Sequence, residues 1–143
     1  MEPVMNASTV TLAFYKGEGY LLDKAIRWWT NSSYSHVAII IDGTCFEADA
    51  WKGWVVSRSW GLYYNTANWD LVNVDADKEK VWSFLLDNIG KRYDYPGVVG
   101  FLLPWRPQVQ SWRYCSELTA AALGHEKTKV SPGDLAEIFL NKR

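Results

Sequence analysis

The sequence YSHVAIIIDGTCFEAD, residues 34–49, decides the fold because it encodes two β-strands joined by a tight turn. The first run is rich in β-branched residues, and Asp42-Gly43 separates it from a second apolar run. Asp-Gly between two such runs is the strongest short-range signal for a β-hairpin. We therefore predict an antiparallel hairpin made of residues 34–41 and 44–48.

The register of this hairpin follows from a two-residue loop at Asp42-Gly43, which places Ile41 opposite Thr44. Side chains alternate along a strand, so the hairpin has two distinct faces. The predicted core face carries Val37, Ile39, Ile41, Phe46 and Ala48, and the other face carries His36, Ala38, Ile40, Cys45, Glu47 and Asp49. On the second face His36 and Glu47 are diagonal neighbours, roughly 7–8 Å apart at the backbone, so the carboxylate can reach the imidazole.

A second stretch, RYCSELTAAALG at residues 113–124, predicts a helix with a cysteine in its first turn. Its Ala/Leu-rich body favours helix, Gly124 is placed to end it, and Pro104 and Pro107 argue against helix upstream. Free N–H groups and the positive end of the helix dipole favour a thiolate at Cys115 and can hold an oxyanion. For a cysteine in an Ala-rich helix, a buried packing role is the more common alternative.

The remaining pattern predicts a sheet with flanking helices. Further strands are expected at 9–15, 51–57 and 69–74, and further helices at 20–30, 77–89 and 131–139. Asp77 and Ser131 are the expected N-caps of the last two helices. Their expected apolar stripes are Val81, Trp82, Leu85, Leu86 and Ile89 in the first, and Leu135, Ile138 and Phe139 in the second. The apolar segment 98–103 fits either core packing or a lid over a groove.

Composition limits the class of protein. The 143 residues predict a single domain, 1–143, and a content of 48% hydrophobic and 22% charged residues argues against disorder. A net charge of -1 with scattered Lys and Arg offers no surface for nucleic acid or an anionic membrane. Two cysteines and two distant histidines make neither a disulfide framework nor a zinc site, so we expect no metal or organic cofactor.

The N-terminal sequence MEPVMN lacks the basic and apolar regions of a signal peptide. The longest apolar runs, 37–41 and the Gly-interrupted 98–103, are too short to span a bilayer. We therefore expect a cytoplasmic protein without stable membrane insertion.

Three residue types in this chain fit nucleophilic catalysis. A cysteine nucleophile needs a base to take its proton and a third group to orient that base. Cys115, His36 and Glu47 supply one of each. Asp49 is an alternative orienting group, because it lies directly opposite His36, although it is placed at the fraying end of its strand.

The other histidine and the other cysteine fit these roles less well. His125 follows Cys115 by ten residues, which is about 15 Å of helical rise, so its ring cannot easily turn back to the thiol. Cys45 lies in mid-strand without a helix N-terminus to activate it. We expect His125 to be solvated and Cys45 to be a packing residue.

Five short motifs resemble one enzyme family. They are SHVAII at 35–40, FEA at 46–48, YDY at 93–95, YCSEL at 114–118 and SPGDLA at 131–136. In this order they resemble the circularly permuted, YiiX-like branch of the NlpC-type papain-fold hydrolases, in which the histidine strand precedes the cysteine helix. The resemblance covers His36 to Phe139. It implies an α+β, circularly permuted papain-like fold, with a small antiparallel sheet packed against the nucleophile helix and flanking helices.

The resemblance also implies the roles of the site residues: Cys115 as nucleophile, His36 as base and Glu47 as orienting group. Family members look like amidases or cysteine peptidases (thiol proteases) acting on cell-wall-type peptides, with relatives that transfer or hydrolyse lipid acyl groups. This chain departs from the secreted members because no signal peptide is seen. A cell-wall substrate would then require another system for export or release, as for phage-encoded enzymes.

We therefore expect a cysteine hydrolase that cleaves an amide or peptide bond in a peptide- or acyl-type small substrate through an acyl-enzyme. One alternative is a thioesterase or acyltransferase with the same triad, which the apolar segment 98–103 would suit. Another is a non-catalytic protein whose aromatic groove binds a sugar or a peptide. Reactivity of the Cys115 thiol near neutral pH separates the enzymes from the binding protein.

Overall fold

A computed structural model describes residues 9–17, 24, 28, 32–49, 52–63, 66–92, 115–124 and 131–141. These residues form an α+β fold with a five-stranded antiparallel sheet in the order β4-β3-β2-β1-β5. The strands are β1 (Thr9–Tyr15), β2 (His36–Ile41), β3 (Thr44–Asp49), β4 (Trp54–Ser59) and β5 (Trp69–Asp75). The helices are α2 (Trp60–Tyr63), the 3-10 turn η2 (Thr66–Asn68), α3 (Lys78–Asn88), α5 (Cys115–Ala122) and α6 (Pro132–Phe139).

The β2–β3 hairpin has the predicted two-residue turn. Ile41 pairs with Thr44, and the two preceding pairs follow in the same register. Asp42 and Gly43 have φ angles of 49° and 84°, so both central residues occupy the left-handed region that a type I′ turn requires. The predicted register of this part of the hairpin is confirmed.

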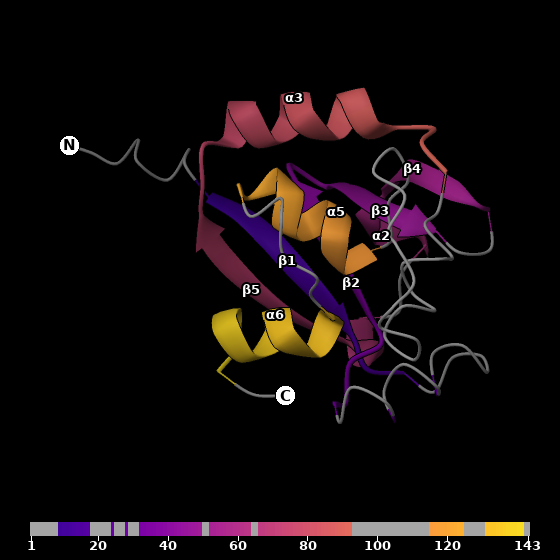
Figure 1. Ribbon diagram of the computed structural model, residues 1–143, viewed down its shortest axis with the longest axis vertical. Coiled ribbons are helices and arrows are strands. Elements are labelled where there is room, and N and C mark those ends of the chain that lie inside the picture. The colour runs from indigo at the N-terminus through magenta and orange to yellow at the C-terminus, as the bar shows by residue number, and fades with distance from the viewer. Residues whose placement is uncertain are drawn as a thin grey trace, which may run out of the picture.

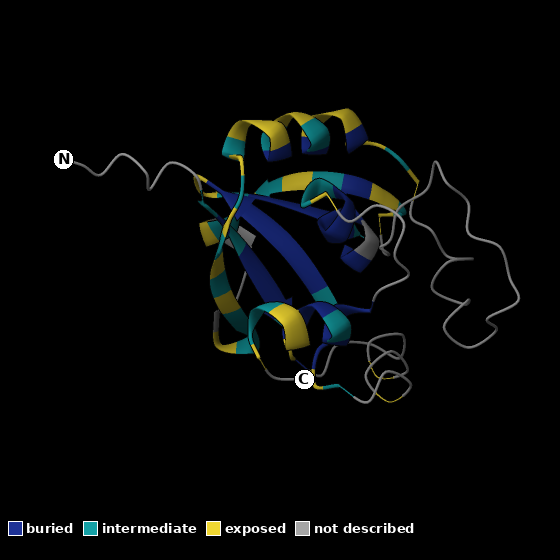
Figure 2. Cartoon of the chain, turned by 60° about the vertical axis from the view of Figure 1, so that its left-hand side comes forward, coloured by how far each residue is buried: buried dark blue, intermediate teal, exposed yellow. Residues whose placement is uncertain are grey.

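The three longer helices cover one face of the sheet (Figure 1). α5 packs directly against β2 and β3, and it also contacts both α3 and α6. The main core lies between these layers, as the dark-blue strands beneath the helices in Figure 2 show. It includes Leu12, Phe14, Ile39, Phe46 and Val55 from the strands and Val81, Leu85, Leu118 and Leu135 from the helices. The predicted core face of the hairpin is therefore the face that the helices cover.

The opposite face of the sheet carries a second, smaller apolar cluster. Ala13, Ala38, Ile40 and Cys45 form it, and Trp60 and Trp69 pack against it. Small side chains on three adjacent strands leave room for two indole rings to lie over them. This face is therefore apolar in its middle, with the His36–Glu47 pair toward the end where β2 begins and the Thr11–Asn73 hydrogen bond toward the other end.

Both predicted helix caps are present. Asp77 accepts a hydrogen bond from the Lys80 backbone N–H at 3.2 Å and begins α3. Ser131 and Asp134 form a reciprocal capping box at the start of α6, with distances of 2.9 and 3.1 Å. Gly124 follows α5 with a φ of 91°, which suits a helix stop. The described part of α5 begins at Cys115, and because the residues directly before it lie outside the described ranges, its predicted start stays a prediction.

The predicted boundary of the fourth strand is wrong. We expected residues 51–57, whereas β4 runs from Trp54 to Ser59. Gly53, at φ 89°, donates a backbone hydrogen bond to the Asp49 carbonyl at 2.8 Å, and this turn delays the start of the strand. The later start carries β4 two residues past its predicted end and brings Arg58 into the sheet.

The predicted apolar stripes of α3 and α6 are too wide. Leu86 and Ile89 are 48% and 40% exposed, and Ile138 is 67% exposed. Each helix touches the core along a narrower line, which in α3 is Val81, Leu85 and Asn88. The side-chain amide of Asn88 donates a hydrogen bond to the Phe84 backbone carbonyl at 2.7 Å. This bond allows a polar residue on the buried side of α3.

Some predictions concern residues outside the described ranges. The expected helix at 20–30 is described only at Lys24 and Trp28, both of which are helical. The segment 98–103, the motif at 93–95 and His125 lie outside the described residues, so their predictions stand as made. Among the described helices, none is long and apolar enough to cross a membrane.

Candidate active site

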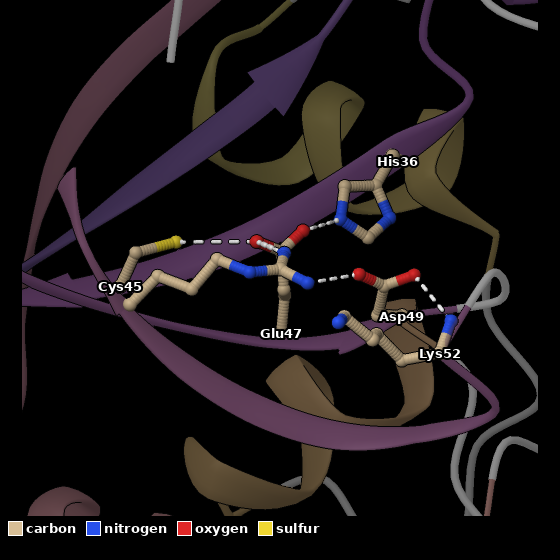
Figure 3. A network of polar contacts seen from close by, with 6 residues as sticks. His36, Cys45, Glu47, Asp49 and Lys52 are labelled. Atoms are coloured by element: carbon tan, nitrogen blue, oxygen red, sulfur yellow. Dashed lines mark hydrogen bonds and ion pairs between the residues drawn. The ribbon is translucent and has the colours of Figure 1, made fainter. Parts of the chain in front are cut away.

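His36 and Glu47 meet at one end of the β2–β3 hairpin. His36 is the first residue of β2, and its Nε2 lies 2.7 Å from Glu47 Oε1 (Figure 3). Glu47 comes from β3, where only 7% of its side chain is exposed, and 18% of the His36 side chain is exposed. The carboxylate therefore holds one ring nitrogen and leaves Nδ1 for a second partner. The predicted hydrogen bond between these two residues is confirmed.

Arg58 is a member of this cluster that the sequence analysis did not identify. It lies on β4 opposite Cys45, and its Nη1 donates to Glu47 Oε2 at 3.1 Å. Its Nη2 donates to Asp49 Oδ2. The signal that could have found it is the strand period: with β3 and β4 paired as observed, Arg58 falls on the face of Glu47.

In the described chain, the hydrogen bond and ion pair of His36 go to Glu47 and not to Asp49. Its carboxylate accepts from Arg58 and, at 3.0 Å, from the backbone N–H of Lys52 (Figure 3). The Lys52 bond stabilises the turn between β3 and β4. Of the two candidate orienting groups, Glu47 is therefore the one in contact with the imidazole.

Cys115 is the third residue brought to this place. It is the first described residue of α5, it is 3% exposed, and the charge and hydrogen bonding of its side chain raise the pKa of the His36 imidazole. At the first residue of a helix, the backbone N–H has no partner within the helix and points toward the same end as the side chain. His36 and Glu47 are thus joined by a hydrogen bond, and Cys115 acts on the same imidazole through its charge and hydrogen bonding.

The charge state of His36 reflects these neighbours. Burial of the ring lowers the pKa of His36, but the charge of the Cys115 thiolate, its hydrogen bond and the Glu47 carboxylate together raise that pKa well above 6.5. The arrangement therefore favours the protonated form of His36. An imidazolium beside a thiolate is the state in which a cysteine attacks a carbonyl carbon.

The second cysteine lies in a different environment. Cys45 is fully buried in mid-strand, and its Sγ is 3.9 Å from Glu47 Oε2. Burial, with the negative charge of Glu47, raises the pKa of the Cys45 thiol well above its usual range. Cys45 is therefore a neutral packing residue, as its position in the strand predicts.

The segment before His36 is held by its own contacts. The Ser35 backbone N–H donates to the Tyr15 carbonyl at 3.1 Å, which aligns the start of β2 with the end of β1. The hydroxyl of Tyr34 donates to Asp70, which also pairs with Lys16 at 2.8 Å. The Trp69 ring approaches the His36 ring edge to face, with centroids 6.0 Å apart. These contacts restrict the imidazole to the orientation that reaches Glu47.

No family model matches the chain, and no curated protein matches it either. Within the described part of the chain, no group of three or more His, Cys, Asp or Glu side chains is arranged to hold a metal ion.

Proposed function

We propose that this protein is a cysteine hydrolase that cleaves an amide bond in a peptide-type substrate. The observation that carries this proposal is the position of His36, whose Nε2 contacts Glu47 and whose pKa is raised by the charge and hydrogen bonding of Cys115. In this proposal Cys115 is the nucleophile, His36 the general base and acid, and Glu47 the group that orients the imidazole.

The proposed cycle follows from these positions. The Cys115 thiolate attacks the carbonyl carbon, and the Cys115 backbone N–H contributes to holding the oxyanion of the tetrahedral intermediate. Collapse breaks the C–N bond as the His36 imidazolium gives its proton to the leaving amine. Neutral His36 then takes a proton from water, whose oxygen attacks the acyl-enzyme and releases the carboxylic acid and the thiolate.

The same proposal extends to the fold. We propose the circularly permuted, NlpC-type papain-like arrangement, in which the histidine strand precedes the cysteine helix. The order of β2, β3 and α5 along the chain supports it, as does the packing of α5 on those two strands. The five sequence motifs and their order are the second line of support. On this basis the substrate class is a small peptide or a cell-wall-type peptide.

Covalent capture tests the proposal directly. The chain would be incubated with peptidoglycan fragments, acyl-peptides and acyl-thioesters, and the trapped acyl group located by intact mass and peptide mapping. We expect an acyl-enzyme at Cys115 from an amide substrate, none in Cys115→Ala, and normal capture in the matched variant Cys45→Ala. Capture from thioesters alone would replace the amidase by a thioesterase. No capture at Cys115 from any of them would favour the aromatic-groove binding protein.

A further inference from the structure

Two largely buried carboxylates lie on β3 beside the histidine. Glu47 and Asp49 are two residues apart in β3, so they share a face of the strand. Their side chains are 7% and 14% exposed, which leaves little water to screen their mutual repulsion. Without a cation between them, this repulsion would push the two carboxylates apart.

Arg58 is placed to prevent this. Its guanidinium uses separate nitrogens for the two acids, Nη1 at 3.1 Å from Glu47 Oε2 and Nη2 bonded to Asp49. Burial lowers the pKa of Arg58, but its bonds and charge interactions with Asp49 and Glu47 raise that pKa above the ordinary value. The cation therefore remains charged between the two acids, and its rigid fork fixes the direction of both.

The two oxygens of Glu47 have different partners. Oε2 accepts from Arg58, while Oε1 faces Nε2 of His36 at 2.7 Å. Because a carboxylate is planar, fixing Oε2 also fixes the direction of Oε1. Arg58 on β4 thus affects the orientation of the His36 imidazole on β2 through the side chain of Glu47 on β3.

We propose that Arg58 is a positioning residue, which holds Glu47 in place beside Asp49 and aims the Oε1 oxygen of Glu47 at His36. Arg58 acts on His36 through Glu47. The catalytic meaning of this role rests on the proposed function, but the coupling of Arg58 to His36 does not. The charged or titratable groups around the imidazole in the described chain are Tyr15 from β1, Glu47 and Asp49 from β3, Arg58 from β4 and Cys115 from α5, with Cys45 against Glu47.

The direction in which the pKa of His36 moves when Arg58 is replaced separates the positioning role of Arg58 from two other possible roles. Simple loss of a nearby positive charge in Arg58→Met would raise the pKa of His36. Loss of an aligned, anionic Glu47 would lower it. If Arg58 only holds β4 to β3, its removal would destabilise the fold and leave the pKa of His36 where it is.

The experiment measures His36 by NMR titration of its imidazole, with His125→Gln used to assign the signal, since the chain has two histidines. In Arg58→Met we expect the His36 midpoint to move to lower pH by about one unit. Alkylation of Cys115 at pH 7, measured in a Cys45→Ala background, should slow about tenfold. Lys78→Met removes the cation of a distant, exposed pair with Asp42 and should leave both measurements unchanged.

A second substitution tests the mechanism. If Arg58 is needed because Asp49 repels Glu47, then Asp49→Asn should restore at least half of the lost alkylation rate when added to Arg58→Met. An unchanged or raised His36 midpoint, or no recovery in the double variant, would overturn the proposal. Should Arg58→Met fail to fold, Arg58→Lys keeps the charge without the fork; a roughly threefold loss supports the proposal and a wild-type profile rejects it.

These measurements do not require a substrate. If Cys115 captures no acyl group while the His36 midpoint still falls in Arg58→Met, the proposed hydrolase is wrong and the positioning role of Arg58 stands. If Cys115 captures an acyl group while the His36 midpoint does not move in Arg58→Met, the proposed hydrolase stands and the positioning role of Arg58 is wrong.

Discussion

The chain contains two buried thiols, and their surroundings differ in the sign of the nearest charge. Cys45 and Cys115 are 0% and 3% exposed, so burial alone does not distinguish them. Cys45 lies in a strand beside the carboxylate of Glu47, which disfavours a thiolate. Cys115 lies in α5 and interacts with the imidazole of His36, which carries positive charge when protonated. In the proposed enzyme, the neighbour of each sulfur, and not its depth in the fold, decides which one acts as the nucleophile.

The largest effect is expected when one of the two cysteines is replaced by alanine. Cys115→Ala should abolish acyl capture and hydrolysis, a loss of at least about a thousandfold, because the nucleophile is gone. Cys45→Ala should keep activity within about threefold and lose only some stability. Iodoacetamide labelling with mass mapping at pH 7 should favour Cys115 in the wild-type chain. Equal labelling of the two, or earlier labelling of Cys45, would contradict the comparison.

His36→Ala removes the positive neighbour and should make Cys115 resemble Cys45. We expect alkylation of Cys115 at pH 7 to slow about a hundredfold and its pH profile to move to higher pH, because the imidazolium no longer favours the thiolate. Circular dichroism should show an intact fold. A pH profile identical to that of the wild type would mean that the two side chains do not interact.

Glu47→Gln keeps the shape of the orienting residue and removes its charge. The pKa of His36 should fall toward 6.5, and Cys115 alkylation at pH 7 should slow about tenfold. A histidine whose folded-state pKa is raised stabilises the fold fully below the unfolded value of 6.5, and this contribution is lost as pH rises through the folded-state pKa. The stability lost in Glu47→Gln, measured by urea unfolding, should therefore be larger at pH 6 than at high pH.

The smallest effect is expected far from both thiols. Ser131→Ala removes one half of the α6 capping box and should cost about 1 kcal/mol of unfolding free energy. The pH profile of Cys115 alkylation should stay as in the wild type. A changed profile would show that stability and thiol reactivity are coupled more widely than through His36 and Glu47.

The parts of the site that were predicted depend on local rules. The Asp42-Gly43 turn accepts two left-handed residues in a row, which sets the register and places His36 and Glu47 on one face. Gly124 and Ser131 mark helix boundaries by equally local chemistry. The interaction of Cys115 with His36, by contrast, depends on how α5 packs across the sheet.

What the sequence did not reveal depends on longer-range geometry. Arg58 reaches Glu47 only because the turn at Gly53 delays β4, and the predicted strand ended one residue before it. The place of β1 between β2 and β5 is set by packing of the whole sheet, for which no local pattern codes. Likewise, the exposure of Ile138 depends on how far α6 tilts onto the core, which an apolar stripe does not specify.

The two-residue turn also sets an arithmetic condition on any search for similar sites in other chains. His36 and Glu47 are separated by eleven positions, an odd number, and with an even turn only odd separations place two hairpin residues on the same side. A chain whose turn is one residue longer needs a separation greater by one to preserve the pair. A search should therefore ask whether the number of positions between the histidine and the glutamate is odd or even for the given turn length. A search pattern with one fixed spacing would miss chains that form the same pair with a longer turn.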